Sequence, residues 1–238
     1  MSLGKVYSSP VAAVADIWDG ALVLIAGFAG CGWPECLIKA LVVQGSKSLT
    51  VICQGEWREQ RGEHGVGLGI QSLVANGQVR KLISPMAFDP SDFGKVPSKD
   101  TAGEVETRWK SGALEIEVVP QGALAERLRS GGAGMGGVFL PTGAGTRFGA
   151  DREVRIFGGR DHLFEPGLKA DFALLRAEAG DTLGNLIYHG TQRNWNPVMA
   201  MAAGISIAEV NEIYEAGELD GELVVTPGIF VKRIVETN

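Results

Sequence analysis

The chain has 238 residues, of which 45% are hydrophobic, and carries a formal net charge of -6 at neutral pH. This acidic balance, without a cluster of Lys and Arg, excludes nucleic acid as an expected partner, because binding the phosphate backbone requires such a cluster. The first residues lack the charged and apolar regions of a secretory signal, and no apolar run approaches the roughly 20 residues needed to cross a bilayer, which predicts a cytoplasmic protein without membrane contact.

The first predicted strand is the uninterrupted apolar run Leu22 to Ala26, which suits a strand buried on both faces. A glycine-rich loop follows, and then a predicted helix over Glu35 to Gln44. We expect Pro34 in the first turn of this helix, where its missing N–H costs no hydrogen bond, with Glu35 beside the positive end of the helix dipole. A strand, a glycine loop and a helix N-terminus in this order let backbone N–H groups face an anion or a carbonyl oxygen.

Short apolar strands and helices continue to alternate along the chain. This order predicts an α/β fold with an open, mostly parallel sheet, helices on both faces and right-handed crossovers. Because no stretch has the composition of a linker, we expect a single domain over residues 1–238. In such a sheet, ligands bind beyond the carboxyl ends of the strands. The further expected strands are Leu49 to Ile52, Val79 to Ile83, Glu115 to Val119, Val138 to Leu140, Val154 to Phe157, Phe172 to Ala177, Ile205 to Val210 and Val224 to Val225, and the further helices are Gly69 to Asn76, Ala123 to Arg129 and Pro197 to Ala203.

A second glycine-rich stretch, Gly131 to Thr146, contains a Gly-x-Gly-x-x-Gly pattern at Gly132, Gly134 and Gly137. A dinucleotide-binding loop must leave a strand and open a helix. Here the predicted helix comes before the glycines and the predicted strand comes after them, so the pattern is not a nucleotide fingerprint. Residues without a Cβ allow close approach of the backbone, either to a ligand or to another part of the protein.

The three cysteines form neither a disulfide framework nor a metal motif. Cys31 and Cys36 are five residues apart, and no histidine lies close to them in the sequence. We therefore expect no metal site. Cys31, in the first glycine loop, is either a reactive thiol or a small residue that fits the loop. No Ser-His-acid arrangement can be assembled from local motifs.

The two glycine-rich stretches resemble the signatures of one enzyme family. Gly27, Phe28, Gly32 and Pro34, after Asp19-Gly20, are similar to the motif of the α subunits of family I CoA-transferases, which include 3-oxoacid, 3-oxoadipate and acetate CoA-transferases. The similarity spans nearly the whole chain. The further matches, in the order of the family, are Val119 to Gly122, the segment A-L-A-E-R-L-R-S-G-G-A-G, Pro141 to Thr146, Asp171 to Leu174, Gly184-Asn185 and Asn194 to Pro197.

The resemblance implies transfer of CoA between an acyl-CoA of the 3-oxoacid type and a carboxylic acid. In this family an enzyme glutamate attacks the acyl-CoA, and an anhydride and then a glutamyl-CoA thioester form. That glutamate belongs to a β subunit, so the resemblance implies a β-subunit partner in an αβ or α₂β₂ complex, CoA and acyl-CoA as substrates, and no cofactor. Gln121 stands at the position of the family's active-site glutamine, whose amide donates to the oxyanion while its own oxygen is fixed by neighbours. Glu35 is a local rival nucleophile, but its place in the first helical turn explains it as an acid that compensates the dipole.

Further residues are expected to bind the substrate. Gln54 follows a predicted strand at the point where 3-oxoacid members carry a pair of asparagines facing the acyl group, and is expected in the acyl pocket. Ala26 replaces a family glycine, and the segment Ser84 to Arg108 is longer than the family's loop, so the acyl donor and acceptor stay open. The expected substrate-binding residues are Gly27, Phe28, Gly32, Gln54, Gly122, Gly132, Gly134, Thr142 and Gly143.

Two other functions fit the same sequence. The first is a related acyl-CoA hydrolase subunit, in which water replaces the acceptor acid on the same scaffold. The second is a non-catalytic ligand-binding module, because the same α/β architecture also serves sugar-phosphate isomerases and effector domains, and a fold does not determine a function. Phosphate binding would predict Lys or Arg within the glycine loops, and only Arg147 adjoins one.

Overall fold

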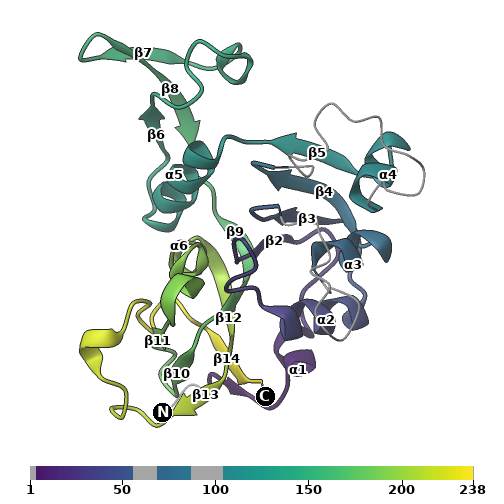
Figure 1. Ribbon diagram of the computed structural model, residues 1–238, viewed down its shortest axis with the longest axis vertical. Coiled ribbons are helices and arrows are strands. Elements are labelled where there is room, and N and C mark those ends of the chain that lie inside the picture. The colour runs from purple at the N-terminus through teal and green to yellow at the C-terminus, as the bar shows by residue number, and fades with distance from the viewer. Residues whose placement is uncertain (1–3, 56–68, 87–103, 238) are drawn as a thin grey trace.

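The computed structural model describes residues 4–55, 69–86 and 104–237. Its centre is an eight-stranded sheet in which neighbouring strands run parallel throughout the described residues (Figure 1). The predicted open, mostly parallel α/β sheet is therefore confirmed. In spatial order its strands are β1 (Val6–Tyr7), β14 (Arg233–Glu236), β12 (Ala203–Val210), β9 (Ala170–Arg176), β2 (Leu22–Ile25), β3 (Leu49–Ile52), β4 (Val79–Ser84) and β5 (Glu115–Val118).

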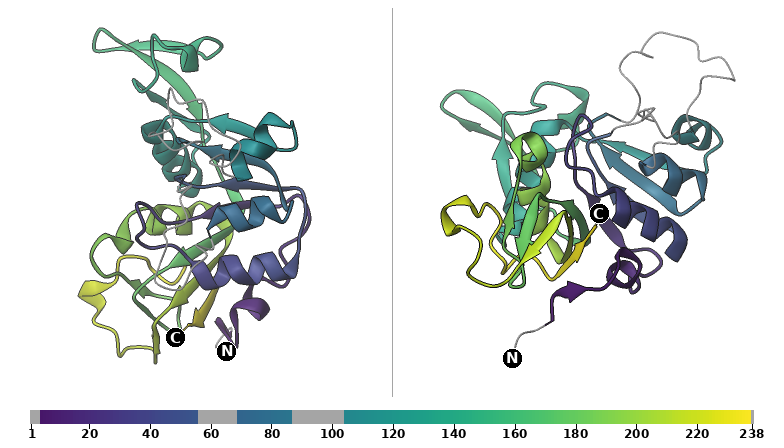
Figure 2. Two further views of the ribbon diagram at one scale, coloured as in Figure 1. Left: turned by 45° about the vertical axis from the view of Figure 1, so that its right-hand side comes forward. Right: turned by 60° about the horizontal axis from the view of Figure 1, so that its bottom comes forward.

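Helices cover both faces of this sheet, as the two views in Figure 2 show. One face carries α1 (Pro10–Val14), α2 (Glu35–Gln44), α3 (Ile70–Ala75) and α4 (Glu104–Lys110), and the other carries α5 (Gln121–Gly132) and α6 (Asn196–Met201). Side chains alternate along each strand, so Val23 and Ile25 enter the first core and Leu24 enters the second. Full burial of each such side chain stabilises the fold by about 1.5–3 kcal/mol. Among these described helices, none is long and apolar enough to span a membrane.

Two small sheets flank the large one. In the first, β10 (Ala179–Asp181) pairs with β11 (Leu186–Ile187) and β13 (Glu212–Tyr214). In the second, β6 (Gly137–Leu140), β8 (Arg160–Pro166) and β7 (Val154–Phe157) are antiparallel and project from the body, at the top of Figure 1. The strands predicted near Val138 and Val154 therefore form, but outside the parallel sheet, because β8 pairs with both of them.

The local signals explain which boundaries were predictable. The expected bounds of α2 and β3 are confirmed: α2 ends where Gly45 takes a left-handed backbone with φ of 86° and donates its N–H to the oxygen of Leu41. Pro34 precedes the first helical residue instead of lying inside the first turn. The predicted strand Val224 to Val225 is wrong. These residues follow the 3₁₀ helix η4 (Gly221–Leu223), and a single N–H, that of Val225, bonds the oxygen of Leu186 before the isolated bridge at Thr226.

Candidate active site

Three predicted segments meet at the carboxyl edge of the large sheet. Because β2, β3 and β5 are parallel members of one sheet, the residues that follow them lie along the same edge. These are the first glycine loop (residues 27–34), Gln54 and Gln121. The expected position of these segments beyond the strand ends is therefore confirmed, and it is the usual place for a ligand in such a fold.

Two glutamines make contact at this edge. The Nε2 group of Gln121, the first residue of α5, donates to Oε1 of Gln54 over 3.1 Å. Gln54 is 1% exposed, and its own Nε2 is buried without a hydrogen-bond partner in the described structure. A buried amide without a partner costs about 1–3 kcal/mol, so it is expected where a ligand completes the bond. The adjacent Cys53 is fully buried, which raises the pKa of its thiol to about 12 and keeps it protonated.

The start of α5 adds backbone donors beside this pair. The first N–H groups of a helix have no partner within it and lie at the positive end of its dipole. Gly122 lies against Thr142: a Cβ added to Gly122 would be 3.3 Å from Oγ1 of Thr142. Gly143 has a φ of +83°, and its oxygen accepts the hydroxyl of Thr146 at 2.7 Å, which closes the turn after Thr142. The structure thus brings Gln54, Gln121, Gly122 and Thr142 to one region.

The first glycine loop contains a tight hairpin at residues 28–31. Phe28 and Cys31 exchange two backbone hydrogen bonds of 3.0 Å, and Ala29 and Gly30 between them have positive φ values of 49° and 79°. This pair of left-handed residues is the pattern of a type I′ turn, and it costs Ala29 about 1 kcal/mol or more. At the base of the loop, a Cβ on Gly27 would lie 2.7 Å from the Trp33 ring, so the glycine makes room for the indole.

Two asparagines at the start of α6, Asn194 just before the helix and Asn196 as its first residue, hold this loop. Asn194 donates from Nδ2 to the oxygen of Cys31 over 3.0 Å. Asn196 is fully buried, donates to the oxygen of Gly32 over 3.1 Å, and accepts the backbone N–H of Arg176 over 2.8 Å. A Cβ on Gly32 would lie 2.8 Å from Nδ2 of Asn196, so the absence of a side chain permits the contact.

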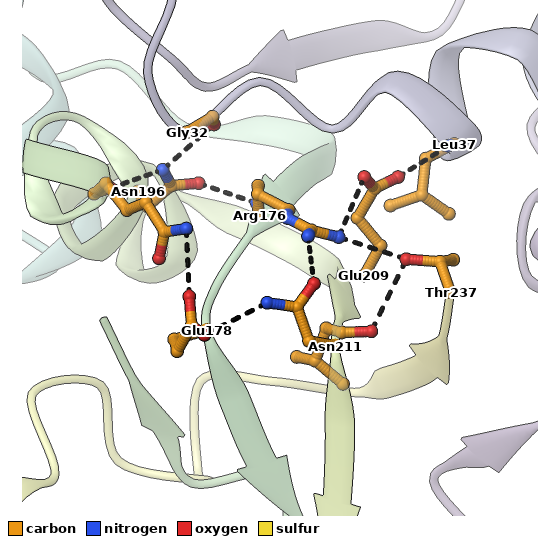
Figure 3. Close-up of polar contacts among 10 residues, drawn as sticks. Gly32, Leu37, Arg176, Glu178, Asn196, Glu209, Asn211 and Thr237 are labelled. Atoms are coloured by element: carbon orange, nitrogen blue, oxygen red, sulfur yellow. Dashed lines mark hydrogen bonds and ion pairs between the residues drawn. The ribbon is translucent and has the colours of Figure 1, made fainter. Parts of the chain in front are cut away.

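A charged cluster lies next to the same loop, at the ends of β9, β12 and β14, and Figure 3 shows its contacts. Nη1 of Arg176 donates to Oε1 of Glu209 over 3.4 Å and to Oγ1 of Thr237 over 3.0 Å. Nη2 of Arg176 contacts the amide oxygen of Asn211, whose Nδ2 donates to Glu178 over 3.1 Å. None of these residues was predicted as a site residue. Arg176 and Glu209 could have been noticed as charges at the ends of two predicted buried strands.

Glu209 links this cluster to the start of α2. Its Oε2 accepts the backbone N–H of Leu37 over 2.8 Å, so it binds the N-terminal turn of the helix that follows the first glycine loop. The carboxyl is 2% exposed, and this burial raises its pKa to about 7 despite the bonds from Leu37 and Arg176. The cluster therefore contains a group that titrates near neutral pH.

Two hollows border the hairpin. A cavity of about 440 Å³ lies between the first glycine loop and the charged cluster and includes Trp33, Glu35 and Cys36 in its lining. The Nε1 group of Trp33 is buried and has no hydrogen-bond partner in the described residues. A shallower hollow of about 550 Å³ lies on Phe28 and Arg193. Among the described residues, no group of three His, Cys, Asp or Glu side chains is arranged to hold a metal ion.

Two predicted site residues lie elsewhere. Gly132 ends α5, whose first residue is Gln121, and eleven residues of helix separate them by about 17 Å. A Cβ on Gly132 would lie 3.0 Å from the backbone of Met201, so this glycine serves helix packing. Gly134, with a φ of +76° and no atom near its Cβ direction, forms the turn after the helix. The structure does not bring either residue to the glutamine pair.

The fold and the carboxyl edge of the large sheet define an α/β protein with polar donors beyond the ends of its parallel strands. Enzymes of this architecture bind their ligands at that edge. The chain belongs to the coenzyme A transferase family, whose model matches residues 7–237. It is therefore a CoA-transferase chain, and the family resemblance seen in the sequence is confirmed.

Individual relatives agree with this assignment. One subunit of a probable succinyl-CoA:3-ketoacid coenzyme A transferase of Bacillus subtilis is 43% identical over 237 residues, which cover 98% of this chain and 90% of the relative. The corresponding subunit of the 3-oxoadipate CoA-transferase of Pseudomonas putida is 40% identical, and the match covers 98% of this chain and 94% of the relative. A solved acyl-CoA transferase of Escherichia coli O157:H7 has the same fold, with a TM-score of 0.80 at 21% identity over 100% of this chain. This chain spans about half of that structure, 48% of its length.

Proposed function

We propose that this chain is the α subunit of a heteromeric CoA-transferase that moves CoA between an acyl-CoA of the 3-oxoacid type and a carboxylic acid. The observation that carries the proposal is the glutamine pair: a buried Gln54 amide whose Nε2 has no partner, held by Gln121 at the carboxyl edge. The names of the relatives support the substrate class, and because each relative is named as one subunit of its enzyme, they also support a second subunit.

The glutamine pair fits an acyl group whose carbonyl oxygen becomes negatively charged during reaction. The family resemblance implies that Gln121 donates to the oxyanion itself, whereas here its Nε2 group donates to Oε1 of Gln54 and so orients the Gln54 amide, whose buried Nε2 group is left without a partner. The free N–H of Gln54 and the backbone N–H groups at the start of α5 then serve as donors to the oxyanion. Donors that are already oriented need no rearrangement as the charge develops, which is why they favour the transition state over the ground state.

The reaction then proceeds through an anhydride and a thioester on the partner subunit. The partner subunit provides a glutamate carboxylate that attacks the thioester carbonyl, CoA leaves as the thiolate, and an acyl-glutamyl anhydride forms. The thiolate attacks the glutamyl carbonyl, the donor acid leaves as its carboxylate, and a glutamyl-CoA thioester remains. The acceptor carboxylate then attacks the glutamyl-CoA thioester, and CoA leaves as the thiolate. The thiolate attacks the acceptor carbonyl of the resulting anhydride, which gives the new acyl-CoA and releases the glutamate as its carboxylate. This chain contributes the oxyanion donors and the acyl pocket, and Glu35, at the start of α2, is not the nucleophile.

An assay with matched mixtures tests the proposal. This chain alone, the partner alone and the two together receive 3-oxoacyl-CoA, with and without succinate as acceptor, and the free thiol and succinyl-CoA are both measured. We expect succinyl-CoA only from the pair with acceptor, and little free thiol. Transfer by this chain alone would exclude the division into subunits. Release of free thiol at an equal rate without acceptor would identify a hydrolase instead.

A further inference from the structure

Two asparagines at the start of α6 bind two successive carbonyl groups of the first glycine loop. Nδ2 of Asn194 donates to the oxygen of Cys31 over 3.0 Å, and Nδ2 of Asn196 donates to the oxygen of Gly32 over 3.1 Å. The oxygen of Cys31 also accepts the N–H of Phe28 over 3.0 Å. Both carbonyl groups therefore have a fixed direction, towards the asparagines, as Figure 3 shows for Gly32.

These bonds also fix the direction of the N–H groups that follow. In a planar trans peptide, the N–H of each residue points opposite to the C=O of the residue before it. The N–H groups of Gly32 and Trp33, here called the donor pair, therefore point away from the asparagines. Neither has a hydrogen-bond partner within the described part of the chain, although Gly32 is buried. Buried N–H groups without a partner are rare, so they are expected where a ligand binds.

The N–H groups that follow, at the start of α2, are occupied. The N–H of Glu35 donates to the oxygen of Trp33 over 3.0 Å. The N–H of Leu37 donates to the buried carboxyl of Glu209 over 2.8 Å, and the N–H of Cys36 faces the same group. The helix N-terminus that the sequence predicts beside an anion thus binds a side chain of the protein itself. The donor pair, and not the helix, is free to bind a substrate.

The donor pair borders a cavity that contains a further free donor. Gly32 and Trp33 both line the cavity of about 440 Å³, and Nε1 of Trp33 is buried without a partner among the described residues. Residues 27–34 contain no Lys or Arg, and the guanidinium of Arg176 in the cavity lining is already bound to Glu209. A phosphate with two charges is therefore disfavoured beside Glu209. A carboxylate has one charge and two oxygens, each of which accepts an N–H, and fits the donor pair.

We infer that Asn194 and Asn196 are positioning residues, which hold the donor pair in the direction in which it binds the carboxylate of the acid substrate. The role rests on the proposed function, because CoA transfer is a reaction that uses a carboxylic acid as a substrate. The donor pair binds and orients the acid at the carboxyl edge, and the two asparagines act only through it. The match at Asn194 to Pro197 thereby gains a role that the oxyanion donors and the acyl pocket do not give it.

The backbone N–H signal of Trp33 in an NMR spectrum tests the contact directly. This chain, labelled with ¹⁵N-tryptophan and assembled with its partner, is titrated with succinate, and Trp33→Phe identifies the signal to follow. We expect a saturable downfield shift of this signal, because the N–H gains a hydrogen bond to a charged oxygen. Sodium chloride at the same ionic strength should not produce it. A signal that stays in place, or that moves equally with chloride, would overturn the inference.

Variants of Asn194 separate positioning of the loop from simple support of α6. Asn194 is half-buried, so its replacement leaves the core intact. Asn194→Asp keeps the oxygen that accepts the N–H of Trp195, but it cannot donate to the oxygen of Cys31. We expect Asn194→Asp and Asn194→Ala each to raise the dissociation constant of succinate in this titration by at least about 10-fold. An Asn194→Asp complex that binds succinate like the parent would mean that the residue only supports the helix, and the inference would fail.

Asn76→Ala is the matched control. Asn76 lies at the opposite edge of the sheet, between α3 and β4, and its Nδ2 donates to Oε1 of Gln78 over 2.8 Å. Its replacement should leave the dissociation constant of succinate within about twofold of the parent, and an equal rise in this variant would also overturn the inference. In the transfer assay, kcat/KM for succinate should fall in the Asn194 variants by the same factor as binding. Because the titration uses no turnover, its failure is distinct from failure of the proposed reaction.

Discussion

The two glycine-rich regions of this molecule look alike in sequence and differ in what they support. In residues 27–32, Gly27 and Gly32 fit against Trp33 and Asn196 and present a hairpin at the carboxyl edge of the sheet. In residues 131–137, Gly131 fits against the backbone of Leu168, and the segment joins α5 to β6. Both regions use missing side chains to pack protein against protein.

The difference between them is position, not glycine content. The first region follows a central parallel strand, so its hairpin lies beside Gln54 and the charged cluster. The second follows the far end of a helix, about 17 Å from Gln121. A dense run of glycines therefore indicates close approach of the backbone, and the neighbouring element decides whether a ligand is involved.

The largest expected effect comes from breaking the second region. In Gly131→Ala, the new Cβ would lie 2.0 Å from the backbone oxygen of Leu168, so α5 must shift from the segment that precedes β9. We expect a loss of at least about 3 kcal/mol in unfolding free energy, measured by urea denaturation. Gly134→Ala is the control: it has a φ of +76° but open space, and should cost about 1 kcal/mol. Equal losses in the two variants would show that packing is not the function of Gly131.

The second largest expected effect is on kcat, at the carboxyl edge of the large sheet beside the first glycine-rich region. Gln54→Leu removes a buried donor without a partner and also the bond from Gln121, whose exposed amide can bind water instead, so stability should change by less than about 1 kcal/mol, while kcat of the complex falls by about 100-fold. Gln78→Leu is the matched control, because the buried Gln78 amide donates to Leu41 and Ser46 at 2.9 and 3.1 Å. It should lose about 1–3 kcal/mol of stability and keep its kcat per folded molecule. A Gln54→Leu complex with kcat within twofold of the parent would remove Gln54 from the reaction.

The charged cluster beside the first region predicts a pH dependence. The pKa of Glu209 is raised from 4.5 to about 7, so its neutral form favours the folded state. The stability from this group is fully present below pH 4.5 and is lost as the pH rises through 7. Relative to the parent, Glu209→Gln should therefore gain about 2–3 kcal/mol between pH 4.5 and 7.5, measured by urea denaturation. A constant difference across that range would mean that Glu209 is charged throughout.

The smallest effect tests the fit within the first region. Trp33→Phe keeps a ring against Gly27 and removes an indole N–H that has no partner in the described structure. Unfolding free energy should change by less than about 1 kcal/mol or increase. Trp33→Ala, which leaves a cavity, should lose about 3–5 kcal/mol. If Trp33→Phe costs as much as Trp33→Ala, the N–H is bonded and the ring alone does not support the loop.

Local signals made part of this structure predictable. The glycine at the end of α2 and the apolar run of β3 fix their bounds, and the parallel order of the strands places residues 27–34, Gln54 and Gln121 at one edge. Arg176 and Glu209 could have been noticed one by one as charges at the ends of predicted strands, but their contact was not predictable, because they are 33 residues apart and meet only through the pairing of β9 with β12. Gly132 and Gly134 were placed in the site because missing side chains allow close approach of the backbone either to a ligand or to another part of the protein, and the sequence does not distinguish the two.

The covalent intermediate tests the central claim, that this chain supplies donors and its partner supplies the nucleophile. The complex is incubated with 3-oxoacyl-CoA without an acceptor, so that the glutamyl-CoA thioester accumulates, and borohydride then reduces the thioester to an alcohol. Peptide mapping locates the resulting mass change. We predict that the mark lies on one glutamate of the partner and on no acid of this chain. A marked peptide that contains Glu35 would contradict the account and make the start of α2 the nucleophilic site.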